Sequence, residues 1–349
     1  MTRALESLIA QYSKEPHDHG HLGNFRVDKS ALDKFPKGTQ IISANQYGTS
    51  AWAATARLHF KLPDGSNQQF FFKAAPGDHG RTLAEGEYHS LSELYKCAPD
   101  LIPKPHSWGR CAATFEHDDT TDGAGAAYFV LTQFIDFIDA TPNPNDPEVD
   151  VRMPDPEQLC AKVARLHRDS RSPTGQFGFH VTTCQGRIPQ ALSWEKNWVV
   201  FFTRMLQHAC AIDCEFNGYW GGLDRLEKQL VSQVVPRLLG ALYRDGRSVK
   251  PSLIHADLWE GNTGTAERGN DVYVFDAAAF YAHSEMDIAY WRSCHNRISD
   301  RVYMRTYFRM CEPSEPKSEW DDRSRLYSVY YNLIYSANHL RLGEAGREL

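Results

Sequence analysis

Three polar residues at short spacings lie between two apolar stretches of the chain. Asp257 follows His255 by two positions, Asn262 lies five positions further on, and Asp276 directly follows the run "VYVF". A carboxylate can accept the proton that a hydroxyl loses as it attacks a phosphate, which makes Asp257 a candidate general base. Amide and carboxylate oxygens suit Mg²⁺, so Asn262 and Asp276 are candidate ligands. The pattern therefore predicts metal-assisted phosphoryl transfer.

The spacing of these residues is that of a protein-kinase catalytic loop. The kinase motif H-R-D-x-x-x-x-N has the same offset between Asp and Asn, and a metal-binding Asp follows it in the DFG motif. Asp and Asn are also common in turns, because their side chains bond to local backbone, and each residue taken alone favours that interpretation. The three together, with suitable partners upstream, favour the kinase interpretation.

A lysine and a glutamate upstream supply those partners. The stretch 41–73 reads as three strands, with Asp64-Gly65 as the turn of a hairpin and Lys73 at the end of the last strand. A helix is predicted at 80–96 from its apolar spacing, and Glu87 lies beside the apolar face. In kinases a strand Lys holds the α- and β-phosphates and a helix Glu orients it. We therefore predict that Lys73 pairs with Glu87, with Glu85 as the competing choice.

The turn between the first two strands contains Gly48, Thr49 and Ser50. In a nucleotide-binding hairpin such a turn can bring backbone N–H groups to phosphates, so these residues are candidates for ATP binding. The turn has one glycine rather than three, and an ordinary hairpin turn is the alternative.

Composition limits the classes of protein to consider. The 349 residues include 38 Lys and Arg and 44 Asp and Glu, a net charge of −6, which argues against non-specific binding of nucleic acid. There is no apolar run long enough to span a membrane, and the first residues suggest an amphipathic helix rather than a signal peptide, so a cytoplasmic protein is expected. The eight cysteines form no C-x-x-C pair; Cys210 and Cys214 share a helix face but lack further zinc ligands, and reduced thiols are expected.

The remainder of the chain reads as mainly helical. A proline- and acid-rich stretch at 139–158 is predicted to be a loop, and helices are expected at 154–170, 193–212 and 222–242. Asp155 is the expected cap of the first of these helices, and Ser284 is the expected cap of a later one.

Four segments together resemble one family. They are "FFFKAA…AEGEYHSL", "FGFHVTTCQGRIPQALSWEKNWVVFFTRML" at 177–206, "HADLWEGN" at 255–262 and "FDAAAFYAHSE" at 275–285. They are similar to segments of the fructosamine kinase (ketosamine-3-kinase) family, within the aminoglycoside phosphotransferase-like kinases. The second resembles a segment close to F-G-F-x-V-x-T-C-x-G-x-x-P-Q, which kinases in general do not share. The last two resemble H-G-D-L-W-x-G-N and D-P-A-x-F-Y-G-H-x-E.

The resemblance implies a fold and a reaction. The fold is α+β and bilobal, protein-kinase-like, with a small antiparallel-sheet N-lobe at 1–135 (N-terminal helix, sheet and one regulatory-type helix) and a larger, mainly helical C-lobe at 136–349. The reaction is ATP- and Mg²⁺-dependent phosphorylation of the sugar 3-hydroxyl of ketosamines, free or on protein lysines. The product sheds the sugar, so the implied role is deglycation. From the composition, no nucleic-acid or membrane partner is expected.

The resemblance also assigns roles to single residues. By position Asp257 is the base, Asn262 and Asp276 bind metal, and Lys73 and Glu87 form the phosphate-binding pair. Three further residues fall where the family lines its sugar site: Trp259, His283 and Glu285. An aromatic face packs on the C–H surface of a sugar, which gives Trp259 a physical reason. Its alternative role is a loop anchor, and the alternative for Glu285 is a first-turn helix acid.

The chain departs from the family motifs at three alanines. Ala256 and Ala282 replace glycines, and Ala277 replaces a proline. Alanine in place of glycine is tolerated where φ is negative and strained where φ is positive. Because the charged and amide residues remain, an active enzyme is expected. A kinase for a small molecule such as an aminoglycoside and a non-catalytic ATP-binding pseudokinase are the alternatives. The preferred sugar, the choice between free and protein-bound substrate, and the oligomeric state stay open.

Overall fold

The computed structural model describes residues 3–13, 23–115, 125–138, 153–293 and 296–339. Its contacts divide the chain into two compact units, the first made of Met1–Ser92 and Pro103–Ile135 and the second of Glu93–Ile102 and Asp136–Leu349. Most of the proline- and acid-rich stretch, residues 139–152, lies outside the described residues.

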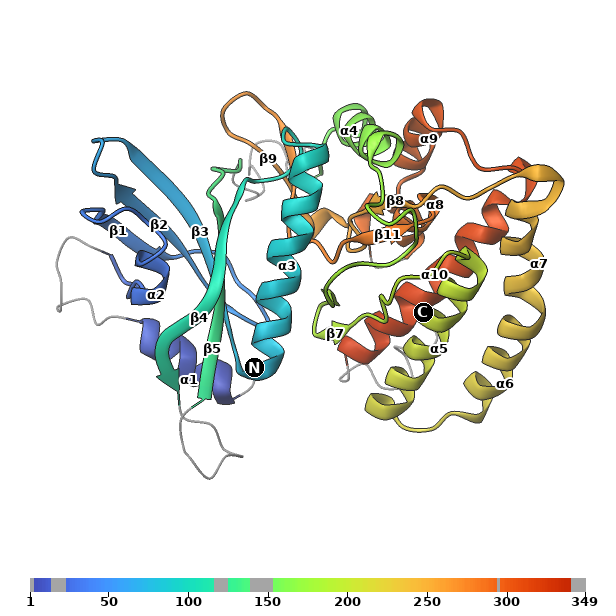
Figure 1. Ribbon diagram of the computed structural model, residues 1–349, viewed down its shortest axis with the longest axis horizontal. Helices are drawn as coiled ribbons and strands as arrows, with labels where there is room; N and C mark the ends of the chain where they lie inside the picture. Colours follow the sequence, from blue (N-terminus) through green and yellow to red (C-terminus); the bar gives the residue numbers. More distant parts are fainter. Residues whose placement is uncertain (1–2, 14–22, 116–124, 139–152, 294–295, 340–349) are drawn as a thin grey trace, which may run out of the picture. The chain divides into compact units, whose positions relative to one another are not determined.

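The first unit is built on an antiparallel sheet (Figure 1). Its described strands follow the order β1-β2-β3-β5-β4, and every neighbouring pair is antiparallel. The expected hairpin turn at Asp64-Gly65 joins β2 to β3; Gly65 has φ +85°, and the Asp64 side chain accepts the backbone N–H of Ser66 at 2.9 Å. The strands are β1 Gln40–Gln46, β2 Ala54–Lys61, β3 Asn67–Pro76, β4 Pro105–Phe115 and β5 Gly125–Gln133.

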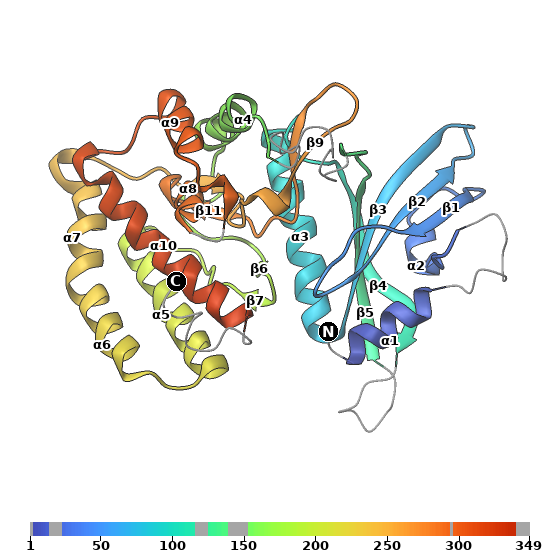
Figure 2. The same cartoon turned by 180° about the vertical axis from the view of Figure 1, so that it is seen from behind.

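The two faces of this sheet have different partners, because alternate residues of a strand point to opposite faces. On β3 the even-numbered Phe70 and Phe72 lie in the core, where Phe72 contacts Tyr12 of α1 (Arg3–Tyr12). The short helix α2 (Lys29–Leu32) packs against β4. Lys73 points the other way, toward α3 (Gly77–Cys97), which Figure 2 shows along the face away from α1.

The second unit is mainly helical in its described part. Helix α5 packs along α10, and α4 packs on α9. Large aromatic side chains fill the interior between them; Trp198, Tyr327, Tyr330 and Tyr331 are each at most 1% exposed. The α-helices are α4 Pro156–Asp169, α5 Trp198–Asn217, α6 Gly221–Gln229, α7 Val235–Gly240, α8 Glu285–Ala289, α9 Arg301–Met310 and α10 Trp320–Asn338. Short 3₁₀ turns cover Ala241–Gly246, Glu260–Asn262, Tyr290–Arg292, Arg297–Ser299 and Lys317–Glu319.

In the described part of the second unit, three short two-stranded ladders carry the loops. They pair β8 (Ser252–Ile254) with β11 (Phe280–Ala282), β9 (Thr263–Thr265) with β10 (Val272–Val274), and β6 (Cys184–Gln185) with β7 (Ile188–Pro189). The sheet of the first unit and the helices of the second confirm the expected α+β class.

The local predictions for the helices hold with three corrections. Asp155 caps α4 through Gln158, as expected, but α5 begins only at Trp198, where the side chain of Asn197 caps it. The stretch 222–242 is not one regular helix: a π-turn at Leu230–Val234 comes just before Pro236, which lacks the N–H that a regular helix needs. Ser284 occupies the cap position of α8, but its side chain makes no capping hydrogen bond.

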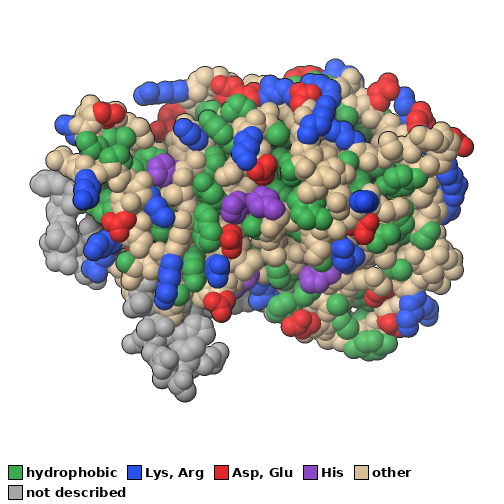
Figure 3. Space-filling view, in the orientation of Figure 1, with side chains coloured by type: hydrophobic (Ala, Val, Ile, Leu, Met, Phe, Trp, Pro, Cys, Tyr) green, Lys and Arg blue, Asp and Glu red, His purple; other side chains and the backbone are tan. Residues whose placement is uncertain are grey.

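Two further features are the distribution of charged side chains on the surface and the apolar character of the described helices. Acidic and basic side chains are interspersed over the face shown in Figure 3, as their similar numbers suggest. Among the described helices, none combines the length and the apolar character needed to cross a membrane.

Candidate active site

The loop that carries Asp257 is held between two ladders of the second unit. Ile254, the last residue of β8, is paired with Phe280, and Thr263, the first residue of β9, is paired with Val274. The loop 255–262 and the returning segment 275–279 therefore run side by side. Backbone bonds join them, since Phe275 donates its N–H to the carbonyl of Asn262 at 3.0 Å. The predicted base and both predicted metal ligands are thus brought to one part of the fold.

His255 fixes the start of the loop from within. Its Nε2 lies 3.0 Å from the carbonyl oxygen of Phe275, and its Nδ1 lies 3.3 Å from the backbone nitrogen of Asp257. A carbonyl only accepts and an N–H only donates, so the hydrogen of the neutral ring is on Nε2. Burial lowers the pKa of His255, which keeps the ring in this neutral form.

Both carboxylate oxygens of Asp257 are held by side-chain amides. Asn262 donates from Nδ2 to Oδ2 at 2.9 Å, and Gln185 donates from Nε2 to Oδ1 at 3.1 Å. The Asn262 amide nitrogen also donates to the backbone carbonyl of Asp257 at 2.9 Å. These bonds leave the carboxylate oriented but still able to accept, because each oxygen has two lone pairs.

The predicted metal ligands are compatible with Mg²⁺. The amide nitrogen of Asn262 makes both bonds of that side chain within the described part of the protein, so its carbonyl oxygen is left for another partner. Asp276 has φ +55°, a conformation that non-glycine residues seldom adopt and that often marks functional sites. Its carboxylate is close enough to His255 to raise that pKa, against the larger effect of burial. An amide oxygen with a carboxylate suits Mg²⁺, which takes its other ligands from phosphates and water.

A buried aspartate that the sequence did not single out anchors the loop. Asp287 of α8 is 0% exposed; its Oδ2 accepts the backbone N–H of His255 at 3.0 Å and its Oδ1 accepts that of Ala256 at 2.8 Å. His167 of α4 donates from Nε2 to Oδ2 at 3.0 Å. Burial opposes ionisation, but these donors hold the pKa of Asp287 below its usual value. The sequence signal was an acid in the first turn of a predicted helix, which usually faces water.

In the first unit, Lys73 pairs with the glutamate that was preferred. Its Nζ lies 2.9 Å from Oε2 of Glu87, and both side chains are mostly buried. The competing Glu85 instead lies 3.8 Å from Nε of Arg81, in a more exposed pair. The ion pair that a kinase would use to orient its lysine is therefore formed.

The turn proposed to contact phosphates lies between β1 and β2. Gly48 and Thr49 are exposed, and Gly48 has φ +73° with open space where a Cβ would be. Ser50 is half-buried, and its Oγ accepts the backbone N–H of Trp52 at 3.2 Å. Their part in nucleotide binding stays a prediction.

Comparison with known proteins identifies the family. The fructosamine kinase family model matches residues 33–342. The chain belongs to the fructosamine kinase family. Mouse ketosamine-3-kinase is 28% identical over 298 residues, covering 82% of this chain and 87% of the mouse protein. A chloroplastic protein-ribulosamine 3-kinase of Arabidopsis thaliana is 24% identical over 359 residues, covering 98% of this chain and 94% of the plant protein.

Solved structures show the same fold. A putative fructosamine-3-kinase from Thermobifida fusca superimposes with a TM-score of 0.64 at 20% identity, covering 93% of this chain and 96% of the other. An aminoglycoside phosphotransferase, solved in a ternary complex with streptomycin and ATP, gives a TM-score of 0.53 at 14% identity, covering 93% and 95%. This member of the fructosamine kinase family therefore has the bilobal, protein-kinase-like α+β fold.

The departures from the fructosamine kinase motifs have different structural consequences. Ala256 has φ +64°, so this alanine occupies a left-handed conformation that glycine adopts without strain. Ala282 lies in strand β11 and Ala277 lies beyond Asp276, and neither has a positive φ. Strain from a missing glycine is thus confined to the residue before the proposed base.

Trp259 is placed where it could face a substrate. It follows Asp257 by two positions, is half-buried, and packs its ring over Gly261, where an added Cβ would come within 2.3 Å of Cη2. This contact explains the glycine of the W-x-G-N motif, because a larger residue would displace the ring. The ring is anchored on one side by the loop, and its contact with sugar stays a proposal.

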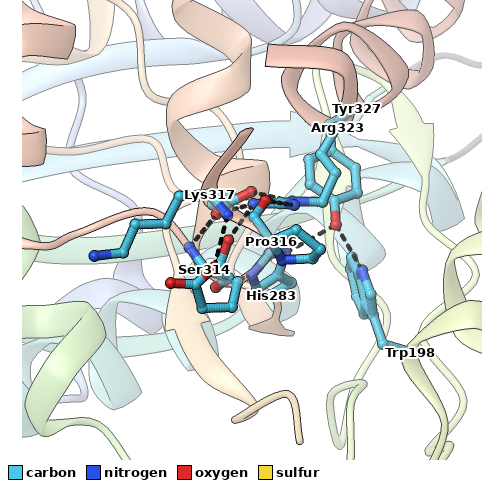
Figure 4. A network of polar contacts seen from close by, with 9 residues as sticks. Trp198, His283, Ser314, Pro316, Lys317, Arg323 and Tyr327 are labelled. Atoms are coloured by element: carbon cyan, nitrogen blue, oxygen red, sulfur yellow. Dashed lines mark hydrogen bonds and ion pairs between the residues drawn. The ribbon is translucent and has the colours of Figure 1, made fainter. Parts of the chain in front are cut away.

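His283 and Glu285 are buried instead, and Figure 4 shows His283 in a network of polar contacts with Tyr327 and Ser314. Nδ1 of His283 is 2.8 Å from the hydroxyl of Tyr327, and Nε2 is 2.9 Å from Oγ of Ser314. Glu285 forms a two-pronged ion pair with Arg323, at 2.7 Å and 2.9 Å, and accepts the backbone N–H of Ser314. Both residues are at most 5% exposed. Since their polar atoms are used internally, we assign them a structural role and no contact with the sugar.

Proposed function

We propose that this protein is an ATP-dependent kinase that phosphorylates the 3-hydroxyl of ketosamines, with Asp257 as the general base. The observation that carries the proposal is the catalytic loop of a fructosamine kinase family member. The side-chain amides of Gln185 and Asn262 each donate to one carboxylate oxygen of Asp257, and the chain belongs to that family. A base oriented in this way before the substrate arrives is suited to accept a hydroxyl proton.

The substrate class follows from the relatives. The mouse relative is named a ketosamine-3-kinase and the plant relatives are named protein-ribulosamine 3-kinases, so a ketosamine on a small amine or on a protein lysine is the proposed acceptor. The aminoglycoside phosphotransferase with a similar fold was solved with ATP, which supports ATP as the donor. The cytoplasmic location expected from the sequence stays a prediction, and the plant relatives are described as chloroplastic.

In the proposed mechanism each residue has one task. Asp257 accepts the proton of the sugar 3-hydroxyl as that oxygen attacks the terminal phosphorus of ATP; the bond from that phosphorus to the bridging oxygen breaks, and ADP leaves. Gln185 and Asn262 keep the carboxylate in place. Lys73, oriented by Glu87, binds phosphate oxygens of the nucleotide. Asn262 Oδ1 and the Asp276 carboxylate would hold Mg²⁺, which neutralises charge on the phosphates when it is bound.

Trp259 is the proposed contact for the sugar. An indole face covers the C–H surface of a sugar, and a half-buried ring two positions from the base needs little ordering to do so. The sugar contacts that the sequence predicted for His283 and Glu285 are not part of this proposal.

The deciding experiment measures ATP consumption with lysines modified by fructose, ribulose, erythrulose and psicose, beside an aminoglycoside and the Asp257→Asn variant. Turnover on a ketosamine that falls about 10²- to 10⁴-fold in the variant, while nucleotide still binds, is the expected result. Turnover on the aminoglycoside alone would support the small-molecule alternative. Nucleotide binding without any turnover would support a pseudokinase. The observation that favours this alternative is the strained backbone at Ala256.

A further inference from the structure

Besides Asn262 of the catalytic loop, one residue from outside that loop, Gln185, contacts the proposed base. Gln185 ends β6, in the segment "FGFHVTTCQGRIPQ" that distinguishes this family, at a position that the family pattern T-C-x-G leaves open. The side chain is buried, with 4% exposed, although glutamine is mostly found at the surface. Its location therefore needs an explanation.

The backbone around Gln185 is fixed by α10. Asn338, at the end of that helix, donates from Nδ2 to the carbonyl of Gln185 at 3.0 Å and accepts the backbone N–H of Arg187 at 3.0 Å. Gly186 between them has φ +58°, and a Cβ there would lie within 2.7 Å of the Asn338 side chain. The hairpin therefore presents the Gln185 side chain in one place.

The orientation of the amide is set by its partner. Nε2 of Gln185 is 3.1 Å from Oδ1 of Asp257, and an ionised carboxylate accepts hydrogen bonds but cannot donate one. The amide nitrogen must face Asp257, and the carbonyl oxygen must face elsewhere. That oxygen, Oε1, is buried and has no hydrogen-bond partner among the described residues.

Gln190, five positions further along the chain, is a buried glutamine whose hydrogen bonds are those of a structural role. Gln190 is equally buried, but its Nε2 donates to Thr183 and to the carbonyl of Ala278, and its Oε1 accepts the hydroxyl of Tyr330. Both ends of that amide are used internally. In Gln185 one end holds the base and the other is left unsatisfied, which native proteins seldom tolerate away from functional sites.

We propose that Gln185 contacts the acceptor substrate as well as positioning Asp257: Nε2 orients the base, and Oε1 accepts a hydrogen bond from a sugar hydroxyl or the amine of the ketosamine. This inference rests on the proposed function and adds a residue that sets acceptor specificity. One amide would thereby link the orientation of the base to recognition of the group that it deprotonates. Glutamine at a position that the family pattern leaves open would make this contact a property of this chain.

The first test compares Gln185→Met with Gln190→Met. Methionine keeps the length of the side chain and removes both polar atoms. For Gln185→Met we expect kcat/KM for the ketosamine to fall about 10- to 100-fold, with KM for ATP changed less than about twofold. The melting temperature should be unchanged or higher, because a buried unsatisfied oxygen is removed. Gln190→Met should lower the melting temperature without a selective effect on the KM for ketosamine.

The second test identifies the substrate group and the link to the base. Ketosamines that each lack one hydroxyl, and one with a methylated amine, are compared on the wild type and on Gln185→Met. The analogue that has lost the partner of Oε1 should be poorer on the wild type and no poorer on the variant. The remaining effect of Gln185→Met on kcat should disappear when Asp257→Asn is already present.

Two experimental results, one with Tyr290→Phe and one with Gln185→Met, would overturn the inference. Tyr290 lies beside the same amide, so if Tyr290→Phe abolishes the selective analogue effect, the tyrosine rather than the substrate is the partner of Oε1. Equal kcat/KM for Gln185→Met and the wild type would also exclude the proposed role. A wild-type protein without turnover on any ketosamine would instead refute the proposed function, and this inference with it.

Discussion

The backbone N–H of Ala256 donates to Oδ1 of Asp287 at 2.8 Å, and it does so from a left-handed conformation with φ +64°. The other oxygen of the same carboxylate accepts the N–H of His255 and Nε2–H of His167. Two adjacent N–H groups converge on one carboxylate, which accounts for the unusual conformation. The residue before the proposed base is thus held in a strained state by a buried charge.

The strain at Ala256 can be measured against a matched alanine. Ala256→Gly and Ala282→Gly each remove one fully buried methyl group and add the same freedom to the unfolded chain. Ala282 lies in a strand without a positive φ, so its replacement should cost about 1 to 2 kcal/mol. The left-handed penalty of an alanine is of similar size, so Ala256→Gly should leave the free energy of unfolding nearly unchanged. Equal losses in urea titrations of the two variants would show that Ala256 is not strained.

Asp287→Asn should be among the most damaging single changes in the second unit. The substitution keeps the size of the side chain but removes the charge and turns one oxygen into a donor that faces existing donors. We expect the free energy of unfolding to fall by roughly 3 to 5 kcal/mol, the range for breaking a buried charged contact. Asp321→Asn provides the control, because Asp321 bonds Arg292 and Arg325 near the surface and should cost less than about 1 kcal/mol. Similar losses for the two variants would contradict the anchoring role.

Two glutamates on one turn of α3 separate a nucleotide-binding role from a surface role. Glu87→Gln removes the partner of Lys73, and we expect KM for ATP to rise about tenfold because the lysine is no longer held in place. Glu85→Gln removes a partner of Arg81 in the more exposed pair and should change KM for ATP by less than about twofold. Steady-state kinetics at saturating ketosamine would measure both. An effect of Glu85→Gln on the KM for ATP as large as that of Glu87→Gln would contradict the assignment of Glu87 as the residue that orients Lys73.

Local patterns predicted the parts of the site that depend on short spacings. The strand that carries Lys73, the helix that carries Glu87 and the loop from His255 to Asn262 each follow from periodicity and turn residues within about 20 positions, although the strand continues to Pro76 instead of ending at Lys73. Contacts between distant segments were not predictable in this way. Gln185 meets Asp257, Asp287 meets His167, and Glu285 meets Arg323 only because the second unit folds. A motif shows that His283 and Glu285 belong together, but burial by partners far along the chain decides that their role is internal.

The internal role of His283 gives the protein a dependence on pH. Burial lowers the pKa of His283 to about 4, from an ordinary value of 6.5; Glu285 raises it, whereas Arg323 and His167 lower it further. Between these two pH values the unfolded chain binds a proton that the folded protein does not. Stability therefore falls as the pH drops from about 6.5 to about 4, by roughly 3 kcal/mol for this difference in pKa.

His283→Gln tests this contribution, since an amide can bond the hydroxyls of Tyr327 and Ser314 but does not titrate. The free energy of unfolding of the wild type should fall by about 3 kcal/mol more than that of the variant between pH 7 and pH 4. Burial also lowers the pKa of His255, but that effect is common to both proteins and cancels in the comparison. The pKa values of Glu285 and Asp287 are lowered against the effect of burial, so their stabilising contributions begin to be lost only as the pH falls below the ordinary values of 4.5 and 3.8. Parallel pH profiles would show that His283 binds its proton as readily in the folded protein as in the unfolded chain, which contradicts a lowered pKa for this residue.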